Sequence, residues 1–197
     1  MIRTVLFDLD GVVRHFDSEH VVNIEQRHGI GAGVINAYAF SSPIIERVTT
    51  GRITRQAWIE QIGAHLGNEA AAAEWGRQRS EVDPGMMDLA DEIRSVGRTT
   101  AILTNGTDTI PEEMIAADLH WHFDPIFNSA EIGYAKPDQR AFQHVLDALD
   151  LKPDELFFTD DSPSKLVGAD ALGIVTHHFV DVAGLRAALD EQGVRVN

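Results

Sequence analysis

Two aspartates near the N-terminus, Asp8 and Asp10, are the first residues whose type and spacing could do chemistry. The apolar run Val5–Phe7 precedes them and Gly11 follows, a pattern typical of a buried strand that ends in a turn. Because side chains alternate along a strand, both carboxylates project to the same side. They can therefore share one metal ion or one phosphoryl group. The same pattern also fits two solvated acids, so the rest of the chain must decide.

Three further segments place polar side chains just after a predicted strand. These are Thr104 and Asn105 after 99–103, Lys136 between the strand at 126–128 and the helix opened by Pro137, and Asp160 and Asp161 after 156–159. The carboxyl ends of parallel strands meet at one edge of a sheet, where open α/β sheets bind their ligands. We therefore expect all of these residues to form one site with Asp8 and Asp10.

The region from Asp83 onward alternates between predicted helices and strands. Apolar residues at helical spacing, such as Met86, Leu89 and Ile93, separate short runs that favour strands. Such alternation predicts βαβ units and a parallel sheet covered by helices on both faces. The expected fold is α/β, with a doubly wound, Rossmann-like core.

Residues 14–83 interrupt this pattern with an all-helical insert. Caps and apolar spacing predict about four helices and no strand, the helices running from Ser18 to Gly29, Pro43 to Gly51, Thr54 to Gly67 and Asn68 to Ser80. Trp58 and Trp75 are interpreted as core residues of this insert. The predicted domains are a core of residues 1–13 and 84–197 and a helical cap of residues 14–83.

The predicted site combines four carboxylates with one hydroxyl and one lysine. Carboxylates this close repel one another unless a cation lies among them, and hard oxygen ligands suit Mg²⁺. Thr104 and Lys136 can then hold phosphate oxygens. One aspartate can attack phosphorus while its neighbour gives a proton to the leaving group.

Taken in order, the four segments resemble the four motifs of the haloacid dehalogenase superfamily of phosphotransferases. The matching stretches are Phe7-Asp8-Leu9-Asp10-Gly11-Val12, Leu103-Thr104-Asn105-Gly106, Gly133-Tyr134-Ala135-Lys136-Pro137-Asp138 and Phe158-Thr159-Asp160-Asp161-Ser162. Each is short, but the ordered set is specific and spans the core on both sides of the insert. The insert resembles the small helical-bundle cap of one subgroup, and its turn Gly51-Arg52-Ile53-Thr54 is similar to that of sugar-phosphate phosphatases.

The resemblance implies a role for each residue. Asp8 is the nucleophile and Asp10 is the general acid/base. The implied metal ligands are Asp8, Asp10 through its carbonyl, Asp161, and Asp160 in a supporting role. The implied phosphate-binding groups are Thr104, the backbone of Asn105, and Lys136. The implied activity is a Mg²⁺-dependent phosphatase that hydrolyses a small phosphomonoester, such as a sugar phosphate, through an aspartyl-phosphate.

Two alternatives stay open: a phosphomutase, which returns the phosphoryl group to a sugar, and a non-catalytic protein that binds phosphoryl ligands. Dehalogenation is not expected, because the founding dehalogenases lack the second acid of motif one and Asp10 is present here. Lys165 stands where many relatives have Asn and is expected to face solvent. Four arginines in or beside the insert are interpreted as surface residues that a substrate's remote group could meet, namely Arg14, Arg47, Arg52 and Arg55.

Composition limits the partners. The 197-residue chain has a formal charge of −15 and no cysteine. The acidic balance argues against a nucleic-acid partner. No apolar stretch approaches the roughly 20 residues that span a bilayer, and the N-terminus lacks the pattern of a signal peptide. We expect a cytoplasmic protein that acts on a small phosphorylated metabolite; the sequence predicts no oligomeric state.

Overall fold

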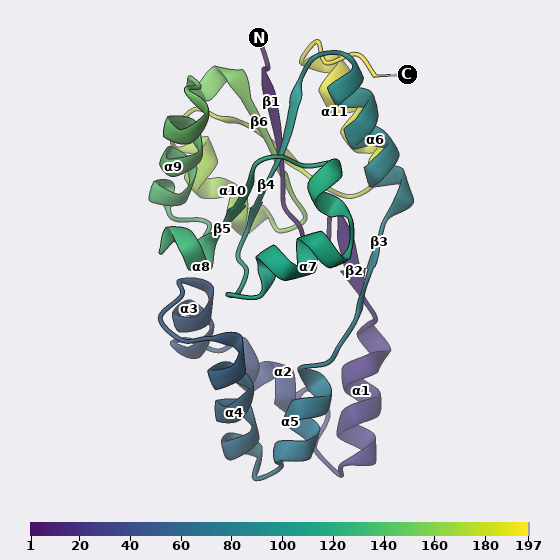
Figure 1. The fold of residues 1–197 in the computed structure, drawn as a ribbon, viewed down its shortest axis with the longest axis vertical. Coiled ribbons are helices and arrows are strands. Elements are labelled where there is room, and N and C mark those ends of the chain that lie inside the picture. Colours follow the sequence, from purple (N-terminus) through teal and green to yellow (C-terminus); the bar gives the residue numbers. More distant parts are fainter. Residues whose placement is uncertain (197) are drawn as a thin grey trace.

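A five-stranded parallel sheet lies at the centre of the core, in the order β5-β4-β1-β6-β7 (Figure 1). The computed structural model describes residues 1–196. The strands are β1 (Thr4–Phe7), β4 (Thr99–Thr104), β5 (Ile126–Asn128), β6 (Leu156–Asp160) and β7 (Val175–His178). Each pairs in parallel with its neighbours. The predicted α/β, doubly wound core is confirmed.

Side chains alternate between the two faces of the sheet, and each face is buried. Val5 and Phe7 of β1 belong to one hydrophobic cluster, whereas Leu6 belongs to the other. The helices that pack on the first face are α6 (Pro84–Ser95), α7 (Ile110–Ala116) and α11 (Val182–Glu191). Those on the second face are α9 (Gln139–Leu149) and α10 (Pro163–Asp170). Shorter pieces complete the core, namely η1 (Leu119–Trp121), α8 (Ser129–Ile132) and η2 (Pro153–Glu155).

The helices between β2 (Arg14–Phe16) and β3 (Ser80–Val82), which we call the cap, lie beyond the carboxyl ends of the core strands (Figure 1). Its helices are α1 (Ser18–Arg27), α2 (Val34–Ala39), α3 (Ile44–Thr49), α4 (Arg55–Leu66) and α5 (Glu69–Trp75). They share a hydrophobic cluster of their own, which includes Trp58 and Trp75. The interpretation of both tryptophans as cap core is therefore confirmed. None of the helices within residues 1–196 is both long enough and apolar enough to cross a bilayer.

Helix α2 was not expected from the sequence, because a side chain from another helix caps it. The buried carboxylate of Glu25 in α1 accepts hydrogen bonds from Gly33 N at 2.7 Å and Ile35 N at 2.9 Å. These amides belong to the start of α2, where helices leave N–H groups unpaired. A capping side chain that comes from another helix leaves no local pattern in the sequence.

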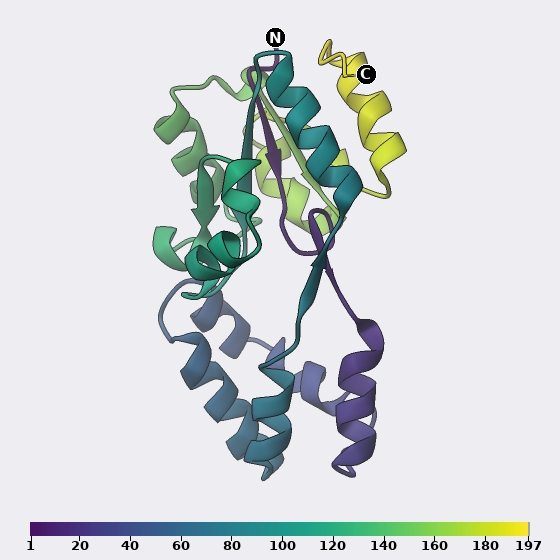
Figure 2. The ribbon, with the colours of Figure 1, turned by 45° about the vertical axis from the view of Figure 1, so that its right-hand side comes forward.

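Two short strands join the cap to the core, so the expectation that the insert contains no strand is wrong. β2 (Arg14–Phe16) pairs antiparallel with β3 (Ser80–Val82), with Arg14 opposite Val82. Figure 2 shows this ribbon as the narrow connection between the two parts. Each strand has only three residues, which is too short for an alternating pattern to show in the sequence.

A second contact between cap and core forms at the turn before α4. Gly51 lies so close to α8 that a Cβ added to it would be 2.1 Å from the Ala130 carbonyl oxygen. Its φ of 70° is also in the region that favours glycine. Close by, Arg55 N donates a hydrogen bond to Asp108 Oδ1 at 2.6 Å. The cap thus touches the core at two places, the β2–β3 ribbon and this turn.

We predict that Glu25→Ala lowers the free energy of unfolding by about 2 kcal/mol or more, because it leaves two amides at the start of α2 without an acceptor. Urea unfolding followed by circular dichroism measures the change. Glu60→Ala is the control, since Glu60 is exposed on α4 and its loss should cost less than about 0.5 kcal/mol. Equal losses in both variants would contradict the capping role of Glu25.

Candidate active site

The carboxyl ends of three neighbouring strands bring the predicted residues together. Asp8 directly follows β1, and its amide donates to the Thr159 carbonyl of β6 at 2.9 Å. Thr104 ends β4 and Asp160 ends β6. One cavity of about 200 Å³ is lined by all seven residues predicted from the sequence and by two more, the full set being Asp8, Asp10, Thr104, Asn105, Lys136, Asp160, Asp161, Ser162 and Lys165.

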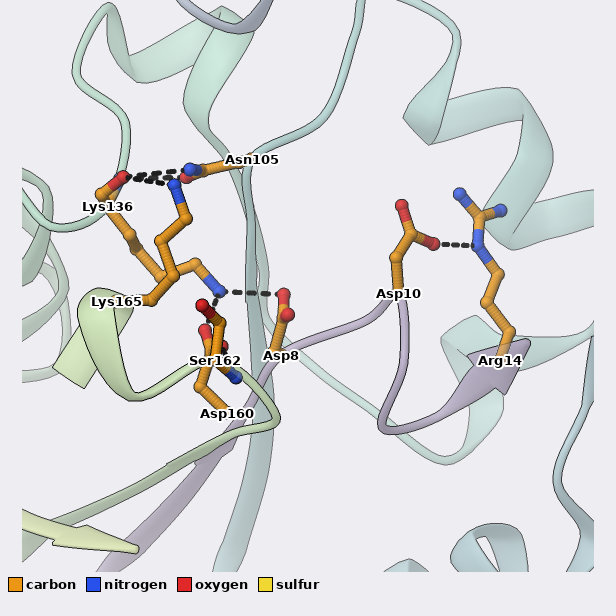
Figure 3. A network of polar contacts seen from close by, with 8 residues as sticks. All are labelled: Asp8, Asp10, Arg14, Asn105, Lys136, Asp160, Ser162 and Lys165. Carbon is orange, nitrogen blue, oxygen red and sulfur yellow. Dashed lines mark hydrogen bonds and ion pairs between the residues drawn. The ribbon is translucent and has the colours of Figure 1, made fainter. Parts of the chain in front are cut away.

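Lys136 is the buried cation at the centre of this site. Its Nζ donates to Asp8 Oδ1 and to Asp160 Oδ2, both at 2.7 Å, and only 3% of the residue is exposed (Figure 3). Nζ also lies 5.2 Å from the centroid of the Phe158 ring. Because Lys136 bonds to Asp160 as well as to Asp8, it ties the Asp8 carboxylate to the end of the neighbouring strand β6.

The side chain of Asn105 holds the backbone of Lys136. Asn105 Nδ2 donates to the Lys136 carbonyl at 2.9 Å, and Asn105 Oδ1 accepts from the Lys136 amide at 2.7 Å. The resemblance assigns only the backbone of Asn105 to the site. The structure adds a positioning contact for its side chain, which no pattern in the sequence indicates because 31 positions separate the two residues.

Burial and unbalanced negative charge shift the pKa values of this site. Burial raises the pKa of the Asp8 carboxyl to about 6, although the Lys136 ammonium acts in the opposite direction. Burial alone would lower the pKa of Lys136, but Asp8 and Asp160 outweigh it and raise that pKa. Burial and then the Asp160 charge raise the pKa of Asp161. The site therefore has more negative charge than Lys136 offsets.

The donor set fits a divalent cation. Asp8, Asp160 and Asp161 each offer a carboxylate oxygen, and these oxygens lie within 4.8 Å of one another. Asp160 is already engaged, since its Oδ1 accepts from Ser162 N at 2.9 Å and its Oδ2 from Lys136. The ion pairs of Lys136 reach Asp8 and Asp160 but not Asp161. Hard oxygen donors with surplus negative charge suit Mg²⁺.

Asp10 is turned away from Asp8 and towards Arg14 (Figure 3). Arg14 Nε donates to Asp10 Oδ1 at 2.5 Å, and Arg14 Nη1 donates to Glu113 Oε2 of α7 at 2.8 Å. Arg14 is only 5% exposed, so its interpretation as a surface arginine is wrong. Burial lowers the pKa of Arg14, but Asp10 and Glu113 outweigh that effect and raise it. The sequence pattern that could have indicated this ion pair is the position of Arg14, four residues after Asp10 and directly after a turn.

Gly11 lets the turn after Asp10 pass close to the second acidic pair. Its φ is 96°, and a Cβ there would lie 2.3 Å from Asp161 Oδ2. Any larger residue would push the Asp161 carboxylate away or strain the backbone. The glycine therefore sets how closely the first and last segments of the site approach each other.

Lys165 lines the cavity, so the expectation that it faces solvent is wrong. Its Nζ donates to the Lys136 carbonyl at 3.3 Å, and the residue is half-buried. Lys165 lies in the first turn of α10, directly after the acidic pair, and from there its long side chain reaches back over the site. Of the other cap arginines, Arg55 lines the space between cap and core and donates to the Gly76 carbonyl at 2.6 Å.

Comparisons with known proteins agree with this geometry. The sequence profile of haloacid dehalogenase-like hydrolases matches residues 2–173. Rat bifunctional epoxide hydrolase 2 is 28% identical over 96% of this chain, which spans only 38% of that protein's length. A phosphoserine phosphatase from Thermus thermophilus is 33% identical over 80% of this chain and 58% of its own. A sesquiterpene phosphatase from Aspergillus oryzae is 28% identical, with 91% of this chain and 90% of the relative aligned.

Solved structures show the same fold. A HAD-family enzyme from Bacteroides thetaiotaomicron superposes with a TM-score of 0.73 at 23% identity, covering 90% of this chain and 93% of its own. The profile match covers most of the chain and includes all four segments of the site. The chain described here belongs to the haloacid dehalogenase-like hydrolase family.

Proposed function

We propose that this protein is a Mg²⁺-dependent phosphatase that hydrolyses a phosphomonoester through an aspartyl-phosphate on Asp8. The observation that carries the proposal is the position of Asp8, whose carboxylate accepts a hydrogen bond from the Lys136 ammonium and offers an oxygen within 4.8 Å of oxygens of Asp160 and Asp161. A second acid, Asp10, lies two residues further on at the mouth of the same cavity. In this proposal the partner is a small phosphorylated metabolite.

The first step uses the free oxygen of the nucleophile. Lys136 holds Asp8 Oδ1, which leaves Oδ2 to attack phosphorus. The new Oδ2–P bond forms as the ester P–O bond breaks, and Asp10 gives its proton to the departing oxygen. Lys136 and the backbone around Thr104 and Asn105 orient the phosphoryl oxygens. A bound Mg²⁺, held by Asp8, Asp161 and the Asp10 carbonyl with support from Asp160, would offset the charge that develops on these oxygens.

The second step reverses the proton transfer. The Asp10 carboxylate accepts a proton from a water molecule as that water attacks phosphorus. The bond between phosphorus and Asp8 Oδ2 breaks, which releases inorganic phosphate and restores the Asp8 carboxylate. Asp10 is then protonated again and ready for the next ester. Arg14, which Glu113 holds from α7, bonds to Asp10 between these steps, so we assign Arg14 as its positioning residue.

The comparisons support phosphate ester hydrolysis but leave the substrate open. Two of the relatives described above are named phosphatases, one for phosphoserine and one for a sesquiterpene. The HAD-family enzyme with the same fold was crystallised with magnesium and inorganic phosphate. The cavities of this chain carry the remaining information on its substrate.

We predict that Asp8→Asn abolishes phosphate release from 4-nitrophenyl phosphate in the presence of Mg²⁺, because an amide cannot form the aspartyl-phosphate. The variant should keep its circular dichroism spectrum, since Lys136 retains its bond to Asp160. Asp147→Asn on α9, outside both cavities, serves as a control with unchanged activity. Turnover by Asp8→Asn at the wild-type rate would remove Asp8 as nucleophile.

We predict that the apparent affinity for Mg²⁺ falls about tenfold between pH 7.5 and pH 5. With a pKa of about 6, Asp8 is mostly protonated at pH 5, and the ion must then displace that proton. In the metal-free protein, the same shift lowers the free energy of unfolding as pH rises from about 4 to about 6. The folded state then holds a proton that the unfolded state has already lost.

Isothermal titration with Mg²⁺ at the two pH values measures this dependence, with unfolding by urea as the second readout. Asp8→Asn should bind Mg²⁺ more weakly and lose most of the pH dependence, since the titrating group is gone. Equal Mg²⁺ affinity of the wild-type protein at both pH values would contradict the assignment.

We predict that Arg14→Gln lowers kcat/KM for an alkyl phosphate by about ten- to a hundredfold, but changes kcat/KM for 4-nitrophenyl phosphate by less than about threefold. This ratio reports the steps up to formation of the aspartyl-phosphate and leaves out the second proton transfer by Asp10. An alkoxide needs the proton from Asp10 to leave, whereas nitrophenolate does not. The exposed Arg47→Gln is the matched control and should leave both rates unchanged. Equal losses on both substrates would instead indicate that Arg14 only supports the fold.

A further inference from the structure

A second and larger cavity adjoins the catalytic one. Its volume is about 920 Å³, near the upper end for ligand pockets, and it lies between the cap helices and α7 of the core. It shares Asp10 and Asn105 with the catalytic cavity. Because Asp10 is the proposed proton donor to the departing oxygen, a bound phosphomonoester extends its leaving group into this space. We call it the leaving-group chamber.

The cap contributes an aromatic wall to the chamber. Phe40, Trp58 and Trp75 pack edge to face, with ring centroids 4.9 Å apart for the two indoles and 5.9 and 6.3 Å from Phe40 to each of them. Both indole N–H groups are already bonded inside the cap. Trp58 Nε1 donates to the Ala39 carbonyl at 3.0 Å, and Trp75 Nε1 donates to Asn36 Oδ1 at 3.1 Å. The wall therefore presents an apolar surface, without free indole N–H donors, to a ligand in the chamber.

The facing wall, from the core, is apolar where α7 forms it, except for Glu113. Ile110, Ala116 and Ala117 line the chamber on this side. The charged groups next to Asp10 are already paired, since Arg14 bonds to both Asp10 and Glu113. Other polar groups of the lining are bonded as well, since Arg55 donates to the Gly76 carbonyl, Gln78 to the Asp17 carbonyl and Thr49 to the Ile45 carbonyl. Ser18, Arg79 and Ser80 also line the chamber. A sugar ring would lose its water against the apolar walls, which is unfavourable for any hydroxyl group left unpaired.

One aromatic side chain of the wall is left largely in contact with water. Phe40 is 56% exposed and lies at the end of α2, facing the chamber. Apolar area of this kind is stabilised when a ligand covers it. Since the chamber shares Asp10 and Asn105 with the catalytic cavity, the body of a bound substrate is the group placed to cover Phe40.

We infer that the substrate is the monophosphate of a long, apolar primary alcohol, with a hydrocarbon chain of about eight carbons or more, in place of the sugar phosphate that the turn at 51–54 suggests. The inference rests on the proposed phosphatase activity. The phosphate binds at Asp8 and Lys136, while the hydrocarbon chain covers Phe40 and the edges of Trp58 and Trp75.

A series of alkyl phosphates tests this inference. Butyl, hexyl and octyl phosphate have leaving groups of nearly equal basicity, so their kcat/KM values differ through binding of the chain. Burial of each methylene should raise kcat/KM about two- to fourfold, and octyl phosphate should exceed butyl phosphate by at least about 16-fold. A flat series, or glucose 6-phosphate turned over faster than octyl phosphate, would overturn the inference.

Acetyl phosphate separates failure of the inference from failure of the proposed function. Its leaving group is small and activated, so its hydrolysis reports on Asp8 and Mg²⁺ without filling the chamber. Turnover of acetyl phosphate with a flat alkyl series overturns only the apolar substrate. If no phosphate is turned over, the phosphatase proposal fails. A ligand-binding measurement then tests whether the chamber takes an apolar chain.

Tryptophan fluorescence supplies that binding measurement. The chain has three tryptophans, and only Trp121, exposed on the core, lies outside the chamber lining. In a Trp121→Phe variant, emission comes from Trp58 and Trp75 alone. Octyl phosphate and octanol should both shift this emission with saturation, whereas glucose 6-phosphate should not. No shift with octyl phosphate would overturn the inference.

Phe40→Asp places a charge on the aromatic wall at a position exposed enough to tolerate it. The ratio of kcat/KM for octyl over butyl phosphate should fall at least about tenfold, and taking the ratio cancels any general loss of activity. Trp121→Asp is the matched control, because it also replaces an exposed aromatic with a carboxylate but lies outside the chamber. An unchanged ratio in Phe40→Asp would overturn the assignment of this wall.

Discussion

A buried ammonium between two carboxylates is the interaction on which the arrangement of this site depends. Lys136, Asp8 and Asp160 come from segments that are 24 and 128 positions apart, and the two carboxylates share the one ammonium. Removing the lysine would leave both carboxylates without this cation, and loss of one partner from a buried ion pair costs about 3–5 kcal/mol. β1 and β6 are neighbours in the sheet, which places Asp8 beside Asp160, and Asn105, which follows β4, holds the backbone of Lys136 next to them.

The ion pairs of Lys136 leave an excess of negative charge at the site. This excess fits the proposed binding of a divalent cation. The lysine binds two of the three clustered carboxylates, while burial and the neighbouring charge of Asp160 raise the pKa of Asp161. A site balanced by lysines alone would have little affinity for a divalent cation. The surplus negative charge favours a cation, which in turn would draw phosphate oxygens towards the nucleophile.

Much of the core could be predicted from the sequence because its determinants are local. Buried strands such as β1 and β6 read as short apolar runs, and the polar residues that end them follow directly in the chain. The rest depends on tertiary contacts. The cap of α2 comes from Glu25 on another helix, Arg14 is buried only because Glu113 meets it from α7, and Lys165 turns inward over Lys136. From the sequence alone, arginine, lysine and glutamate are interpreted as surface residues, because their buried partners lie elsewhere in the chain.

The placement of Arg14 has a mechanical consequence. It is the first residue of β2, one of the two strands that carry the cap, and at the same time it grips the carboxylate of Asp10. Any rotation of the cap about this ribbon would move Arg14 and with it the contact to Asp10, the proposed proton donor. The position of the cap and the orientation of that carboxylate are therefore linked through one side chain.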